Sequence, residues 1–229
     1  MEHSHENIFL DELSTHWKFT AAAVVISGII ISALKLTIFP EASPGTEEVF
    51  EGFFIAHLFF AALTPASLLA KYNRTLWLGV IVAILTSSIT CTLSDIVLPY
   101  LGGVALGYDM HFHICIIEEP VLAWSFIIAG ALIGFLLSKP ARKLSRFTHG
   151  LHILLSSTAA GMYLITYGVS VISIKALIFL PILVIAVLVP CVMNDIGVPS
   201  YIVSMNAGSK ANKRELLDEI HHEHHDHHH

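Results

Sequence analysis

Long runs of apolar residues dominate the chain, and short polar segments separate them. An α-helix of about 20 residues, at 1.5 Å per residue, crosses a hydrocarbon core about 30 Å thick. The apolar runs have this length, so the pattern predicts six membrane-spanning helices. The expected helices cover residues 17–39, 50–70, 76–100, 119–138, 147–167 and 171–193.

Composition supports the same fold class. Hydrophobic types make up 55% of the 229 residues, charged types only 13%, and mean hydropathy is +0.72. These values exclude an ordinary soluble domain. We predict an all-α membrane protein with one transmembrane bundle and the lipid bilayer as its surroundings. The bundle is expected over 17–200, after an N-terminal segment at 1–16 that can form an interfacial helix and before a polar tail at 201–229.

The distribution of basic residues orients the chain. If the N-terminus is cytoplasmic, ten Lys and Arg residues lie inside and only Lys35 and Lys175 lie outside. The positive-inside rule therefore predicts that both termini are cytoplasmic, in a bacterial or archaeal cell membrane. The net charge of −6 comes without a basic stripe, so nothing supports nucleic-acid binding.

A short motif occurs twice. The pattern Cys-x-x-x-Asp-Ile-x-x-Pro begins at Cys91 and again at Cys191, 100 residues later. A weaker similarity links His57 in the second expected helix to His152 in the fifth. Three helices per unit would make the second unit enter the membrane upside down, as in many transporters with inverted repeats. The alternative is a chance similarity, because membrane segments use a limited set of residue types. The predicted repeats cover residues 17–103 and 117–200.

Ionisable side chains within a membrane cost on the order of 3 kcal/mol each, so they tend to face a partner, a cavity or a substrate path. Thiol, imidazole and carboxylate groups together favour a divalent transition metal such as zinc, nickel, cobalt or copper. Interhelical hydrogen bonding is the structural alternative. The candidate ligands within the expected helices are His57, Cys91, Asp95, His149, His152, Cys191, Asn194 and Asp195.

A loop between the third and fourth expected helices offers a second set of ligands. His111, His113 and Cys115 occupy alternate positions, which an extended strand would point to one side. Glu118 and Glu119 follow, so the loop has enough groups for a tetrahedral metal site. A solvated polar loop is an equally good interpretation.

The C-terminal tail carries seven histidines and two acidic residues in its last nine positions. Such a run binds divalent metals in any conformation. An engineered tag is the alternative, although Glu223 and Asp226 interrupt the run. The tail ligands are His221, His222, His224, His225, His227, His228 and His229.

Together these features predict an integral membrane transporter of a divalent transition metal, with a cytoplasmic His-rich tail that buffers the metal. The charge topology places His57, Cys91 and Asp95 toward the outer half, and His152 and Cys191 toward the inner half. A membrane metalloenzyme and a metal-binding accessory or sensor subunit are the rival interpretations. The sequence contains no His-Glu-x-x-His motif, which would have supported an enzyme. A homodimer is compatible with the sequence.

Overall fold

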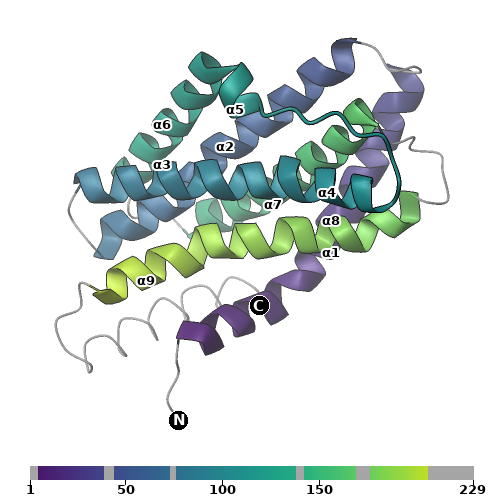
Figure 1. The fold of residues 1–229 in the computed structure, drawn as a ribbon. Helices are drawn as coiled ribbons and strands as arrows, with labels where there is room; N and C mark the ends of the chain where they lie inside the picture. The colour runs from purple at the N-terminus through teal and green to yellow at the C-terminus, as the bar shows by residue number, and fades with distance from the viewer. Residues whose placement is uncertain (1–4, 39–43, 73–75, 138–141, 169–175, 206–229) are drawn as a thin grey trace.

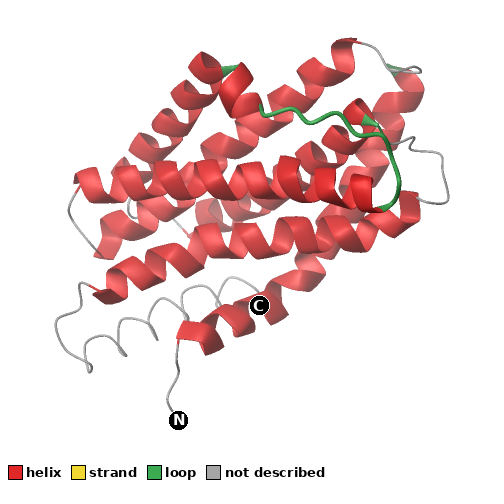
Figure 2. Cartoon of the chain, viewed as in Figure 1, coloured by secondary structure: helices red, strands yellow, loops and turns green. Residues whose placement is uncertain are grey.

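The computed structural model describes residues 5–38, 44–72, 76–137, 142–168 and 176–205 (Figure 1). Within these ranges every regular element is a helix (Figure 2). The prediction of an all-α fold is therefore confirmed for the described part of the chain.

Among the described residues, four helical stretches are long and apolar enough to cross a membrane. Two of them are Glu12–Thr37 in α1 (His5–Thr37) and Gly45–Tyr72 in α2 (Pro44–Tyr72). The third, Trp77–Ala105, runs through α3 (Leu76–Thr92), the π-helix η1 (Leu93–Val97) and α4 (Leu98–Ala105). The fourth, Ile178–Met205, runs through α8 (Ala176–Val192), the π-helix η2 (Met193–Gly197) and α9 (Val198–Met205).

The other two expected helices exist but differ from these four. α6 (Pro120–Leu136) is apolar but has only 17 residues. α7 (Arg142–Tyr167) has 26 residues, and its hydropathy is lowered by polar positions such as His149 and His152. Length and composition thus support four spans and an integral membrane protein, while the number six stays a prediction.

The repeated motif lies inside two long helices and does not end them, which corrects the expected boundaries at residues 100 and 193. In η1 the N–H of Leu98 donates to the carbonyl of Leu93, five residues earlier, and in η2 Val198 donates to Met193 in the same way. The proline that follows each of these donors has no N–H to donate, and a wider π turn stands directly before it in both helices.

The two long helices that carry the motif consist of elements of equal length. α3, η1 and α4 have 17, 5 and 8 residues, and α8, η2 and α9 have the same lengths in the same order, 100 positions later. The equivalence therefore extends well beyond the nine residues of the motif.

α7 forms the centre of the bundle, and its residues 156–164 are all buried. α1 runs parallel to it, with Ser27 and Thr158 joined by a hydrogen bond of 3.0 Å. α2 runs antiparallel to it, because Tyr167 at the end of α7 bonds Glu47 at the start of α2. α1 is continuous from His5 to Thr37, and the N-terminal segment at 1–16 stays a prediction.

α6 packs against α2 through two glycines. A Cβ atom at Gly130 would lie 2.2 Å from the carbonyl oxygen of Phe59, and one at Gly134 would lie 2.3 Å from that of Leu63. Only glycine allows two helix backbones to come this close. The chain reaches α6 through a loop that crosses one end of the bundle and the short helix α5 (Cys115–Glu118) (Figure 1).

Candidate metal centre

Three buried side chains from different helices meet in the middle of the bundle. His57 on α2, His152 on α7 and Cys191 on α8 each place one ligand atom within 4.8 Å of the other two. The Nε2 atoms of the two imidazoles are only 3.3 Å apart. Two ring nitrogens this close either share one proton or direct two lone pairs toward a cation.

A second thiol lies beside the same nitrogens. The Sγ atom of Cys91 is 3.7 Å from Nε2 of His57, and this side chain is also buried. Cys91 lies outside the group of three whose ligand atoms are all within 4.8 Å of one another. With it, the neighbourhood offers two imidazoles and two thiols, the types of ligand that bind zinc tetrahedrally in many proteins. The centre can therefore hold a transition-metal ion.

Asp95 on η1 positions the imidazole of His57. One carboxylate oxygen accepts a hydrogen bond of 2.6 Å from Nδ1 of His57, and the other accepts bonds of 2.6 Å from Ser94 and 2.7 Å from Ser156. A carboxylate at Nδ1 fixes the proton there and leaves Nε2 with a lone pair facing the cluster. Asp95 thus orients the imidazole of His57 and does not itself supply a ligand atom.

Asp195 on η2 has a looser set of partners. Its carboxylate lies 3.1 Å from Nδ1 of His149 and accepts a bond of 2.9 Å from Asn194. Nδ1 of His152 is also buried, but it lies 3.9 Å from the Asp195 carboxylate, which is beyond hydrogen-bond distance. Asp195 is therefore shared between two imidazoles, whereas Asp95 serves one.

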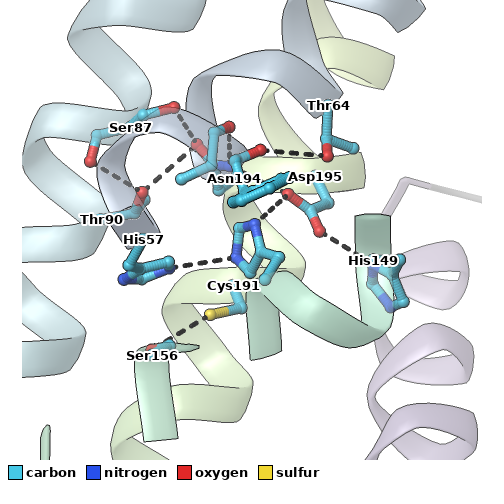
Figure 3. A network of polar contacts seen from close by, with 12 residues as sticks. His57, Thr64, Ser87, Thr90, His149, Ser156, Cys191, Asn194 and Asp195 are labelled. Carbon is cyan, nitrogen blue, oxygen red and sulfur yellow. Dashed lines mark hydrogen bonds and ion pairs between the residues drawn. The ribbon is translucent and has the colours of Figure 1, made fainter. Parts of the chain in front are cut away.

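Asn194 connects three helices at this level. Its amide nitrogen donates to the carbonyl of Ala61, and its amide oxygen accepts bonds from Ser87 at 3.0 Å and Thr90 at 3.3 Å (Figure 3). Each of these groups is buried, so the amide holds η2 against α2 and α3 as well as supporting Asp195.

The network extends toward the start of α1. The rings of His16 and His149 are 5.0 Å apart, and Nδ1 of His16 lies 3.2 Å from a carboxylate oxygen of the buried Glu12. We did not predict these two residues from the sequence. Their spacing of four residues places them on one face of a helix and could have indicated a contact, but the expected first span began after them.

The predicted ligands within the bundle therefore form one connected network. The sequence placed them in an outer and an inner cluster, and the structure joins the two through the contact between His57 and His152. The residues brought together are His57, Cys91, Asp95, His149, His152, Cys191, Asn194 and Asp195.

A second group of ligands lies near the end of the bundle where α2 begins. Glu51 on α2, His113 in the loop and Cys115 on α5 place one ligand atom each within 4.8 Å of one another. Nδ1 of His113 also lies 3.0 Å from a carboxylate oxygen of Glu118. Glu51 was not predicted as a ligand from the sequence, although Glu47 and Glu51 stand one helical turn apart ahead of His57.

The loop does not form the expected extended strand. His111 and Glu119 are exposed and lie outside the three-residue group, while His113 and Cys115 are buried within it. Residues 108–114 are irregular and Cys115 begins a turn of helix, so the side chains from His111 onward do not all point to one side. The tail histidines at 221–229 lie outside the described residues.

Burial raises the pKa of the Cys115 thiol to about 12, and the neighbouring carboxylates of Glu51, Glu119 and Glu118 add to this effect. At neutral pH the free thiol is therefore protonated. The same carboxylates attract a cation, which can displace the thiol proton when it binds.

No protein-family model matches the chain, and no curated protein or solved structure matches it either. The function therefore has to be inferred from the chemistry of the site.

Proposed function

We propose that this protein is an integral membrane transporter of a divalent transition-metal cation. The observation that carries the proposal is the pair of buried Nε2 atoms of His57 and His152, 3.3 Å apart, with the thiols of Cys91 and Cys191 beside them. A cation bound between the two imidazoles would satisfy both Nε2 lone pairs in the middle of an apolar bundle.

The ligand types indicate which cations would be carried. Thiolate and imidazole favour zinc, cobalt, nickel and copper, whereas magnesium and calcium prefer oxygen ligands. Metal binding would have to deprotonate the thiols, so uptake of an ion into the centre would release protons.

The proposal includes an inverted repeat of three helices. α3 to α4 and α8 to α9 have equal element lengths, and they run in opposite directions, because Ser87 contacts Asn194 while Gly102 lies against Ile182. α2 packs on α6 as α7 packs on α1. Each unit would supply one histidine and one cysteine, which would place the centre on the pseudo-two-fold axis between the units.

Polar groups on both sides of the centre support a path across the bundle. On one side lie Glu51 and His113, near the start of α2. On the other side Asp195, His149 and His16 lead toward the start of α1. Within the proposal α6 and α7 complete six spans, with both termini in the cytoplasm and the His-rich tail buffering metal there.

The rival functions fit this geometry less well. A catalytic metal keeps one coordination position open for water or substrate, whereas in this proposal Cys91 fills a fourth position beside His57, His152 and Cys191, and all four side chains are buried. An accessory or sensor subunit would bind the same ion without moving it across the membrane. Transport is therefore the property to measure.

Zinc uptake into liposomes that contain the purified protein and an internal zinc-sensitive dye tests the proposal. We expect uptake by the native chain and a loss of at least about 100-fold in the His57→Ala and His152→Ala variants, since each removes a ligand from the centre. His111→Ala is the matched control, because this imidazole is exposed and lies outside both ligand groups. Zinc binding without uptake by the native chain would contradict transport and favour an accessory subunit.

A further inference from the structure

We propose that Glu51, His113 and Cys115 form a second metal site, separate from the central one. Under the proposed function this outer site would receive the cation before it reaches the centre. Its ability to bind metal does not depend on transport, so the two inferences can fail separately.

Three segments of the chain converge on the outer site. Glu51 comes from α2, His113 from the loop after α4, and Cys115 from the start of α5, and their ligand atoms lie within 4.8 Å of one another. One carboxylate, one imidazole and one thiol make a mixed set that zinc and cobalt accept and that leaves a position for water.

The imidazole of His113 indicates that the site takes a ligand. The side chain is 95% buried, and its Nε2 atom has no hydrogen-bond partner among the described residues. Its nearest carboxylate oxygen, on Glu51, is 3.8 Å away. A buried nitrogen without a partner is unfavourable, and a metal ion between His113 and Glu51 would satisfy it.

Neighbouring side chains hold this imidazole in a ligating orientation. Glu118 lies 3.0 Å from Nδ1, so the proton is kept on that nitrogen and Nε2 keeps its lone pair. The ring also stacks on Tyr167, with ring centroids 5.1 Å apart, and the backbone N–H of His113 donates to the hydroxyl of Tyr163. The loop is thus tied to α7 on both sides of the imidazole.

An aromatic layer separates the outer site from the centre. Phe50 packs on Phe54 and Tyr163, with ring centroids 5.9 and 5.4 Å apart, and none of these three side chains has measurable exposure. Glu51 and His57 are six residues apart on α2, which corresponds to about 9 Å along the helix. An ion in the outer site would therefore contact neither histidine of the centre.

Cobalt binding to the full-length protein tests the outer site. The chain has three cysteines and none lies in the tail, so the near-ultraviolet charge-transfer band between thiolate and Co²⁺ reports only sites that contain cysteine. In the Cys91→Ser, Cys191→Ser variant, Cys115 is the remaining thiol. We expect this variant to keep a thiolate–cobalt band.

The band in that variant should disappear when Cys115→Ser or His113→Ala is added, and it should remain with His111→Ala, which alters an exposed imidazole in the same loop. If no band forms, the outer site does not exist. Loss of zinc uptake in liposomes would leave this band unchanged, so a failure of the transport proposal is distinguishable from a failure of this one.

If the variant with two cysteine replacements does not fold, a single replacement still tests the outer site. In the otherwise native chain, Cys115→Ser should remove part of the thiolate–cobalt band while the contribution of the central thiols remains. An unchanged band after Cys115→Ser would overturn the outer site.

Discussion

The two π-helices have the same backbone structure, but their aspartate side chains make different hydrogen-bond contacts. In η1 the carboxylate of Asp95 accepts three hydrogen bonds of 2.6 to 2.7 Å, one of them from His57. In η2 the contacts of Asp195 are longer, at 2.9 Å to Asn194, 3.1 Å to His149 and 3.9 Å to His152. The aspartate of the first motif therefore contacts its histidine at a shorter distance than the aspartate of the second motif does.

Two differences in side chains account for the inequality. Residue 94 is a serine whose hydroxyl bonds the adjacent Asp95, whereas residue 194 is an asparagine that also reaches α2 and α3. The second unit also has His149 one turn before His152, so two imidazoles compete for Asp195. The two motifs share the position of their proline, while the contacts of each aspartate depend on a few neighbouring residues.

The largest expected difference between the copies is in metal affinity. Asp95→Asn removes the charge that orients His57, and we expect zinc affinity at the centre to fall by about 10–100-fold, the usual effect of losing such a carboxylate. Asp195→Asn should weaken binding less, because Nδ1 of His152 already lies 3.9 Å away. Competition with a chelator measures both values. Equal losses, with normal folded yield, would show that the copies are equivalent.

A second difference concerns folding stability. Asn194→Ala leaves the buried hydroxyl of Ser87 and the carbonyl of Ala61 without their partner, which should lower the free energy of unfolding by about 1–3 kcal/mol. Ser94→Ala removes one of three bonds to Asp95 and should cost less than about 1 kcal/mol. Thermal unfolding in detergent compares the two variants. A larger loss for Ser94→Ala would contradict the bridging role of Asn194.

The smallest effect is expected outside both copies. Deletion of residues 221–229 removes a run of imidazoles that can gather ions in any conformation. Zinc uptake at saturating metal should therefore stay within about twofold of the native rate, and only uptake at limiting metal should fall. Abolished uptake at saturating zinc, with normal protein yield, would show that the tail is part of the path.

Much of the fold and the chemistry of the centre could be predicted from local patterns. The apolar runs identified the helices, and rare residues such as Cys91 and Asp95 marked the centre. The meeting of His57 with His152 could not be predicted, because their 95-residue separation gives no information on distance. Glu51 was missed because an acidic residue near a helix start is usually solvated, and only the loop packed over it gives it a role.

Zinc X-ray absorption tests the central claim most directly. The sample is a chain with Cys115→Ser and with the seven tail histidines replaced by asparagine, loaded with one equivalent of zinc. We predict two sulfur ligands at about 2.3 Å and two nitrogen ligands at about 2.0–2.1 Å, supplied by Cys91, Cys191, His57 and His152. A zinc environment of nitrogen and oxygen without sulfur would contradict the proposed centre.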